Sequence, residues 1–403
     1  MLNKLRLGWI DYSNEHRNRV MAVLDTLTEP EAIDEIGIGT IRDGFANILF
    51  PGTSTIQTRA KYFFLIPYIL MELEKEVKID KPKKLLQKLN EIEIELIGLL
   101  NKDGAEGVIG RRAGQKLKRK PSSIYWNGLR TYGMLKYSNL SLDGYAKAVC
   151  SIKDDKRSIL SHGHNETDLA SDDSDAYQGE ISGGFWRSLP PQPNWKENIS
   201  IELTKEEAYY LKERIIKAPQ SKDSLFAFLL KKDYTEKLVH TNYQEIGTLV
   251  DLPESIRRDY DLARRFAEFI YGASVRYNVI LSNGKNQKAQ ERWEKWRNSV
   301  FVKNEFEMFD FYEVINRLEL ENGKLVRFLR RWKEQVLSGD LSSLDELIIE
   351  REIELKSRER AKLNNSKVYI YQDGHWVGNE DKLQYRLRNT KQLISDIYKG
   401  LEV

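Results

Sequence analysis

Cysteine, histidine and long apolar runs are scarce in this chain of 403 residues. The single cysteine, Cys150, excludes an internal disulfide framework and any structural zinc site built from cysteines. The chain has five scattered histidines: His16, His162, His164, His240 and His375. Their only close pair, His162 and His164, lies in a polar stretch, so we expect no histidine to bind a metal ion. The most apolar run, Tyr62–Leu73, is too short to span a bilayer and contains Pro67. The N-terminus has no apolar segment of signal-peptide length, so we expect a cytoplasmic protein. Separately, we expect no cofactor.

Acidic residues are missing from one long stretch. The chain has 61 Asp and Glu residues and a formal net charge of +3, yet no acid occurs between Glu106 and Asp143. The stretch begins GVIGRRAGQKLKRKPSSIYWNGLRTYGMLKY and contains many Lys and Arg side chains. A cluster of cations without nearby acids creates a local positive field that attracts polyanions.

Helical patterns dominate the chain, which predicts a mostly α protein with minor β structure. Apolar residues at helical spacing predict helices over the following segments: Ser13 to near Pro30, residue 53 to Leu73, Pro82–Leu100, Glu206–Ala218, Ile256–Leu281, Asn286–Val300, Phe306–Leu320, Lys324–Leu337, Ser343–Leu363 and Leu383–Leu401. One hairpin is predicted at residues 367–378, where KVYIYQDGHWVG has Asp373-Gly374 as a two-residue turn.

The chain is longer than one compact core usually covers, so several domains are expected. Residues 151–182 are polar, acidic and poor in apolar side chains, and SLPPQPNW follows them. We therefore predict a helical N-terminal domain at 1–150, a flexible polar insertion at 151–182, and a helical C-terminal domain at 183–403.

The basic stretch is the first candidate site. Pro121-Ser122-Ser123 is a helix-entry signal, and the helix is expected to end near Gly133. On it, Tyr125, Leu129 and Tyr132 share the face expected to point to the core. The residues expected to contact nucleic acid are Arg111, Arg112, Lys116, Lys118, Arg119, Lys120, Trp126, Asn127 and Arg130, where cations would meet phosphates and the aromatic ring would stack on a base.

Several alternatives are open for this stretch. It resembles the recognition helix of winged helix-turn-helix domains over about 15 residues, so a winged-helix-like element is expected in the N-terminal half. Gly107–Gly110 also matches the short GXXG loop of KH domains. The stretch is equally compatible with a solvated basic loop, or with a surface that docks an acidic protein.

A second candidate is an anion site at PGTSTIQTR. A helix start exposes free N–H groups, and the residues that would hold a phosphate there are Ser54, Thr55, Arg59 and Lys61. The competing interpretation is that Ser54 and Gln57 form a capping box and nothing more.

Catalytic patterns are weak. Glu354-Leu-Lys356 matches the last element of a metal-dependent nuclease motif, but the surrounding EREIELKSRERAK is typical of a solvated helix. Cys150 has no partner histidine that the sequence can place, so a buried thiol is expected. No catalytic residue is therefore predicted.

Several segments together resemble an uncharacterised bacterial family that carries only a domain-of-unknown-function label. They are LGWIDYS, GIGTIRD, FPGTSTIQTRAKYF, GVIGRRAG, PSSIYWNGLRTYG, SGGFWRSLPP and YRLRNTKQLISDIY. The resemblance implies a gene in a mobile, phage-defence-type locus near helicase and phospholipase-D-like nuclease genes. It supplies no catalytic residues.

Three functions follow as expectations. The first is a non-enzymatic DNA-binding or scaffolding subunit of a prokaryotic antiviral defence system, with a helicase or a phospholipase-D-like nuclease as partner. The second is an enzyme with an unrecognised site, most plausibly a metal-dependent nuclease. The third is a protein–protein adaptor whose basic segment meets an acidic partner.

Overall fold

The computed structural model of the chain describes residues 34–101, 104–162, 184–365 and 369–402. The predicted helix after Ser13, the motif LGWIDYS and most of the predicted polar insertion lie outside these residues. The same is true of His16, His164 and the side chain of His162. Predictions for these parts stay predictions.

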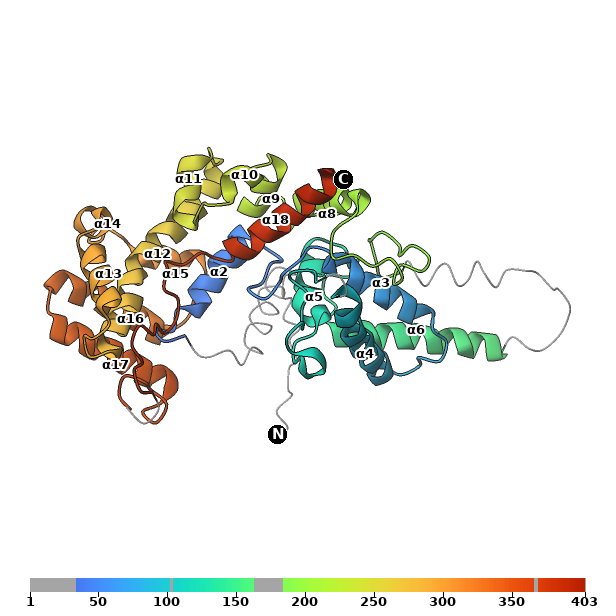
Figure 1. Cartoon of the computed structure of the whole chain (residues 1–403), viewed down its shortest axis with the longest axis horizontal. Helices are drawn as coiled ribbons and strands as arrows, with labels where there is room; N and C mark the ends of the chain where they lie inside the picture. The colour runs from blue at the N-terminus through green and yellow to red at the C-terminus, as the bar shows by residue number, and fades with distance from the viewer. Residues whose placement is uncertain (1–33, 102–103, 163–183, 366–368, 403) are drawn as a thin grey trace, which may run out of the picture. The chain divides into compact units, whose positions relative to one another are not determined.

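The described residues are mainly α-helical (Figure 1), which confirms the mostly α prediction. The longer helices are α2 (Gly39–Leu49), α3 (Tyr62–Lys75), α4 (Pro82–Leu100), α5 (Pro121–Thr131), α6 (Leu142–His162), α8 (Lys205–Lys217), α12 (Glu254–Leu281), α13 (Gln287–Arg297), α16 (Gly323–Ser338), α17 (Leu341–Lys356) and α18 (Leu387–Glu402). Shorter pieces are α9 (Leu225–Lys231), α10 (Thr235–Leu238), α11 (Ile246–Leu249), α14 (Val300–Asn304), α15 (Phe311–Arg317) and the 3₁₀ turns η1 (Gly114–Lys116) and η2 (Tyr243–Glu245). No described helix is long and apolar enough to cross a membrane.

Local signals set several helix starts correctly. Pro82 and Pro121 each stand in the first turn of a helix, where the missing N–H costs no hydrogen bond. At α8 the predicted capping box forms, because the Thr204 side chain accepts from the Glu207 N–H while the Glu207 carboxylate accepts from the Thr204 N–H.

Two local predictions are wrong. The C-terminal hairpin does not form within residues 369–378, because the Val377 backbone bonds the Asn278 side-chain amide of α12 rather than a second strand. Its turn persists, with the His375 N–H bonded to the Gln372 carbonyl at 3.0 Å. The helix expected from residue 53 begins only at Tyr62, so residues 51–61 form a loop.

The first helices pack around α3. This helix is apolar on nearly all sides and almost entirely buried, as expected for a helix without a polar face. α4 and α5 pack against it, and α6 lies along α4 (Figure 1). After α5 the chain makes a single antiparallel bridge between Leu135 and Trp186. Among the described residues this bridge is not extended into strands, so the winged-helix-like element is not confirmed.

The later helices pack around α12, the longest helix described. α13, α15, α17 and α2 all contact it. Its neighbours supply large aromatic side chains, including the fully buried Trp332, whose indole N–H donates to the Phe269 carbonyl at 3.0 Å. The α2 segment therefore packs on α12, although more than 200 residues separate them in sequence.

Contacts also link the segments on either side of the predicted insertion, because α2 packs on α12, Arg59 pairs with Asp396 of α18 and Lys61 pairs with Glu207 of α8. α18 and α8 lie side by side (Figure 1), and residues 34–403 form one compact unit. α6 continues to His162, so the first part of the predicted insertion is helical. The division into domains at 1–150 and 183–403 stays a prediction.

Candidate nucleic-acid interface

The basic stretch begins as an anchored loop between α4 and α5. Val108 and Ile109 are buried, and the Ile109 N–H donates to the Tyr62 hydroxyl at 2.9 Å. Gly107 has φ +80°, and a Cβ there would lie 2.7 Å from the Arg59 side chain. The Thr58 hydroxyl donates to the Gly107 carbonyl at 2.6 Å. Close packing to residues 58–62, rather than a nucleotide, explains the glycine at this position.

Beyond the anchor, the cations of the loop face solvent. Arg111, Arg112, Lys116 and Lys118 are exposed, while Arg119 and Lys120 are half-buried. Arg111 donates to the Gly104 carbonyl at 3.5 Å and Lys120 to the Leu117 carbonyl. The side chains of Arg112, Lys116 and Lys118 have no hydrogen bond or ion pair with any residue that the structure describes. We call residues 104–120 the basic loop; its positive charge is largely uncompensated.

The helical part of the stretch differs from prediction. Trp126 is only 6% exposed, its indole N–H donates to the Leu140 carbonyl at 2.9 Å, and its ring meets Tyr145 and Trp186 edge to face. Arg130 is 7% exposed and donates to the Ser138 carbonyl. The predicted stacking and readout by Trp126 and Arg130 is therefore wrong.

The cause is that α5 is covered on two sides. One side meets α3, and the predicted core residues Tyr125, Leu129 and Tyr132 are fully buried there, as expected. The other side meets α6 and residues 185–187. Asn127 is half-buried. A helix whose two faces are both buried cannot present a row of side chains to a groove of DNA.

The N-terminus of α5 is already occupied by a carboxylate. Glu93 of α4 is fully buried and accepts hydrogen bonds from the Ser122 N–H and the Ser122 hydroxyl. Burial raises the pKa of Glu93 to about 7, against these hydrogen bonds and the nearby Lys120, which lower it. A phosphate at this helix start would have to displace Glu93, so the cations of the basic loop are the groups left to bind an anion.

The predicted anion site at residues 51–61 is wrong for a related reason. Arg59 is buried and pairs with Asp396 at 2.9 Å and Glu202 at 2.7 Å. Lys61 is buried and pairs with Glu207 at 2.6 Å. Both cations are therefore neutralised by carboxylates from α8, α18 and the segment before α8.

The hydroxyl residues of that loop do not cap a helix. The Ser54 N–H donates to the Gln57 side chain at 3.2 Å, but the Ser54 hydroxyl has no hydrogen-bond partner among the residues that the structure describes. The Thr55 carbonyl accepts from Asn389 of α18 at 3.1 Å. Because no helix starts at residue 53, no cluster of free helical N–H groups exists there.

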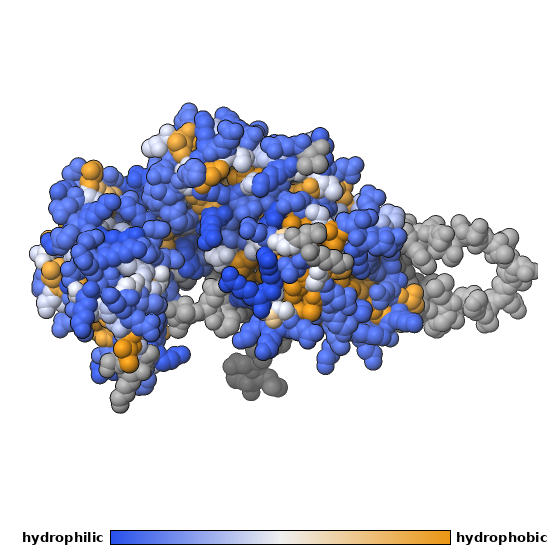
Figure 2. Space-filling view, viewed as in Figure 1, coloured by the Kyte–Doolittle hydropathy of each residue, from blue (hydrophilic) through white to orange (hydrophobic). Residues whose placement is uncertain are grey.

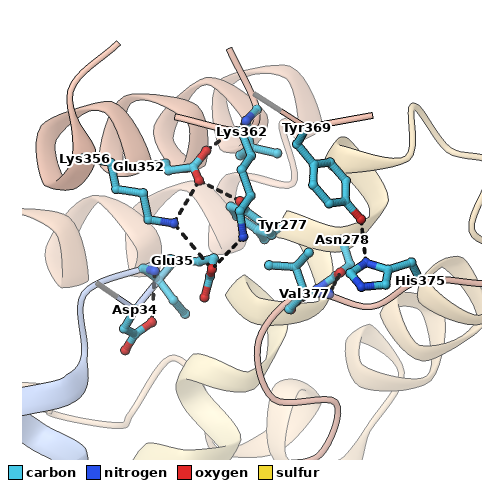
Figure 3. Close-up of polar contacts among 12 residues, drawn as sticks. Asp34, Glu35, Tyr277, Asn278, Glu352, Lys356, Lys362, Tyr369, His375 and Val377 are labelled. Carbon is cyan, nitrogen blue, oxygen red and sulfur yellow. Dashed lines mark hydrogen bonds and ion pairs between the residues drawn. The ribbon is translucent and has the colours of Figure 1, made fainter. Parts of the chain in front are cut away.

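A buried polar cluster joins the start of the described chain to α17 (Figure 3). Glu352 is fully buried and accepts from Tyr277 at 2.7 Å and Lys356 at 3.1 Å. Lys356 also reaches Glu35 at 3.4 Å, and Lys362 reaches the same Glu35 oxygen at 3.3 Å. The two acids and two lysines balance in charge, which is typical of a structural network.

This cluster also accounts for the sequence Glu354-Leu-Lys356. Lys356 belongs to the buried network, whereas Glu354 pairs with Arg351 at 2.6 Å on the same helix. The two residues therefore bond different partners. In the ranges that the structure describes, no group of three or more His, Cys, Asp or Glu residues is arranged to hold a metal ion. Cys150 is buried, as expected.

Several described segments that carry the family resemblance meet around loop 51–61. Its Thr58 and Arg59 N–H groups donate to the Tyr125 hydroxyl of α5 at 2.9 and 3.1 Å. Its Ala60 N–H donates to Asp396 of α18 at 2.8 Å. Arg386, just before α18, reaches the Thr53 carbonyl at 2.8 Å and Asp43 of α2 at 3.5 Å. Sequence reasoning found these segments but not their mutual contacts, because the partners lie far apart in the chain.

Comparison with known proteins gives a family but no activity. Neither the curated proteins nor the solved structures that were compared with the chain include a match. Residues 5–292 match DUF6361, a family of unknown function, and this match covers well over half of the sequence. The chain belongs to the DUF6361 family.

Proposed function

We propose that this protein binds DNA through the basic loop, as a non-enzymatic DNA-binding or scaffolding subunit of a prokaryotic antiviral system. The observation that carries the proposal is the group of exposed cationic side chains that have no partner among the described residues, Arg112, Lys116 and Lys118, on a loop whose backbone is anchored at Ile109. The helicase or phospholipase-D-like nuclease partner rests on the family resemblance alone.

The chemistry of the loop favours contact with phosphates over contact with bases. Lys and Arg side chains neutralise phosphates and release counterions, which gives affinity without sequence preference. The aromatic side chains of α5 and its C-terminal end, Tyr125, Trp126 and Tyr132, are buried in the core, so they are not available to stack on bases. Tyr137, at the end of the stretch, is exposed, and its ring packs edge to face on Phe185. We therefore expect salt-sensitive binding with little discrimination between sequences. The winged-helix-like element and the division into two helical domains stay predictions, and the proposal depends on neither.

The test compares two charge-matched triple variants of the full chain. The first replaces Arg112, Lys116 and Lys118 with Ala. The control replaces Arg258, Lys205 and Lys231, which are also exposed and have no described partner. Both variants lose one Arg and two Lys, so they have the same net charge. Fluorescence anisotropy with labelled oligonucleotides at several salt concentrations measures affinity and its salt dependence.

The loop variant is expected to bind more weakly and to lower the magnitude of the salt slope by about 0.9 per lost contact on duplex DNA. The control is expected to keep wild-type affinity. Equal losses of affinity in both variants would show that the effect comes from the overall charge of the protein and not from the basic loop. Unchanged affinity in both would contradict the proposal and favour an adaptor whose basic loop meets an acidic protein.

A further inference from the structure

A second basic surface lies away from the basic loop, in a groove of about 970 Å³. The segment 239–245, helix α13 and the segment 381–391 line it. We call it the basic groove. Its volume lies at the upper end of the range for ligand sites in proteins. It is formed entirely by described residues of one compact unit.

Two helices supply most of its charge. Arg292 and Lys295 are three residues apart on α13, and Arg388 and Lys391 are three residues apart on α18. This spacing places each pair on one face of its helix. Both pairs line the groove, together with Lys382.

Only some of these cations are neutralised by protein carboxylates. Arg292 pairs with Glu380 at 2.6 Å and Asp381 at 3.4 Å, and Lys382 bonds Glu268. Lys391 donates only to the Val239 carbonyl at 3.2 Å. Lys295 and Arg388 are exposed and have no partner among the residues described. Three cations that form no ion pair with a described carboxylate, Lys295, Arg388 and Lys391, therefore line one groove, although the charge of Glu245 acts on Lys391.

The acidic side chains of the groove do not balance these three cations. Glu245 accepts from the backbone and side chain of Asn242 at 3.1 and 2.9 Å as part of a cap. Asp381 lies with Arg292. His240 also lines the groove and is exposed. The groove thus has an excess of positive charge of the kind that phosphates neutralise.

The aromatic side chains of the groove are not available for stacking, which favours phosphates over bases as the groups that the groove binds. Trp296 is 3% exposed, and its indole N–H donates to the Glu268 carbonyl at 2.9 Å. The Tyr271 hydroxyl donates to the Glu380 carbonyl at 3.2 Å. Lys382 lies over the Tyr271 ring at 5.8 Å from its centre, so neither ring is free as a stacking platform and recognition of a nucleobase by stacking has no support here.

We propose that the basic groove binds the phosphate backbone of a single-stranded segment of nucleic acid. The inference rests on the proposed function and gives it a second contact surface. Loop 51–61 contacts both the basic loop and the helix that carries Arg388 and Lys391. Asn389 of α18 donates to the Gln57 carbonyl at 2.7 Å, and the Thr58 hydroxyl donates to the Gly107 carbonyl of the basic loop at 2.6 Å. A single strand fits the groove because its volume of about 970 Å³ is that of a small-ligand site, and one strand carries a phosphate at every nucleotide that can meet the three separate cations.

The test replaces Lys295, Arg388 and Lys391 with Ala in the full chain. Labelled oligothymidine is the main probe, with a labelled duplex, ATP and inorganic phosphate as further arms. The charge-matched control is again Arg258, Lys205 and Lys231, because both sets contain one Arg and two Lys. Unfolding temperatures of all variants are measured in parallel. Arg388→Ala alone serves if the triple variant unfolds, because Arg388 is exposed and has no described partner.

Oligothymidine affinity is expected to fall roughly tenfold or more in the groove variant, and the salt slope by about 0.7 per lost phosphate contact. The control keeps its affinity. A loss of oligothymidine affinity in the basic-loop variant alone would contradict binding in the groove and would leave the proposed function standing. Loss in the groove variant alone would support the groove and overturn the basic loop as the interface.

The remaining arms identify the source of the phosphate. A groove that binds ATP or inorganic phosphate, but leaves oligothymidine affinity unchanged when its cations are removed, would contradict the strand and indicate a free phosphorylated ligand. Equal loss of duplex and single-strand affinity would contradict the preference for a single strand. Unchanged binding in both the groove and the loop variants would overturn this inference and the proposed function together.

Discussion

Loop 51–61 and the basic loop, residues 104–120, both contain cations next to small polar residues, and both were candidates for binding an anion. In the first, Arg59 and Lys61 are buried and paired with Asp396, Glu202 and Glu207. In the second, Arg112, Lys116 and Lys118 are exposed and have no partner among the described residues. The same residue types therefore hold the core together in one loop and face solvent in the other.

A cation can bind a ligand only if it is exposed and not already paired with a protein carboxylate, so its charge alone does not decide its role. A buried cation must be paired, because an uncompensated charge in the interior is costly. Asp396 lies more than 330 residues from Arg59 along the chain and Glu207 lies more than 140 from Lys61. No local pattern in the sequence predicts either of these ion pairs.

The largest expected effect comes from breaking the buried pair. Asp396→Ala should lower the free energy of unfolding by about 3 to 5 kcal/mol, because it leaves buried Arg59 without its main partner and the Ala60 N–H without an acceptor. Urea unfolding measures it. The matched control is Glu202→Ala, which removes the half-exposed partner of the same guanidinium and should cost about 1 kcal/mol or less. Equal costs would show that burial does not separate the two pairs.

A second comparison lies inside the basic stretch itself. Trp126→Ala should cost about 3 to 5 kcal/mol, since it removes a buried ring packed on Tyr145 and Trp186. Lys118→Ala should change stability by less than about 0.5 kcal/mol, since its side chain is exposed and without a described partner. Thermal unfolding distinguishes them. A Trp126 variant that keeps its stability while losing nucleic-acid affinity would restore the original interpretation of α5 as a reading helix.

A pH experiment sharpens the account of α5. Burial raises the pKa of Glu93 to about 7, above the ordinary 4.5 of an unfolded chain. Between these values the folded protein keeps a proton that the unfolded chain has lost, so the free energy of unfolding should fall as pH rises from about 4.5 to about 7. Glu74, whose pKa burial also raises to about 7, acts in the same direction.

The Glu93→Gln variant should therefore flatten this pH dependence by an amount on the order of 1 to 3 kcal/mol, without removing the part due to Glu74. Unfolding free energies from pH 5 to pH 8 provide the measurement. Glu95→Gln, an exposed position on the same helix, is the control and should leave the slope as in the wild type. An unchanged slope in Glu93→Gln would mean that the Ser122 hydrogen bonds keep Glu93 ionised throughout.

The smallest expected effect tests the cap that did not form. Ser54→Ala should be nearly neutral, because the Ser54 hydroxyl has no hydrogen-bond partner in the part of the chain that the structure describes. Gln57→Ala should cost about 1 to 3 kcal/mol, because the buried Gln57 side chain donates to the Gly52 carbonyl and accepts from the Ser54 N–H. A Ser54 variant destabilised by about 1 kcal/mol would instead indicate a helix cap at this position.

Helix starts and core faces were the parts of the fold that the sequence predicted well. The prolines at 82 and 121 and the Thr204/Glu207 pair act within one turn of backbone, so their effect is visible locally. Tyr125, Leu129 and Tyr132 were placed correctly because helical spacing puts them on one face. The hairpin at 367–378 failed because its backbone found a partner in Asn278, almost 100 residues away.

The candidate site divides in the same way. By itself, the sequence determined that a long acid-free, basic stretch exists, that a helix begins at Pro121, and that one face of that helix is apolar. Only the tertiary structure decided that Trp126 and Arg130 face the interior, that Arg59 and Lys61 are neutralised, and that α13 and α18 meet to form the basic groove. The physical reason is the distance along the chain over which each interaction acts. Helix propensity and capping act over a few residues, whereas the exposure and pairing of a charge depend on groups that folding brings from distant parts of the chain.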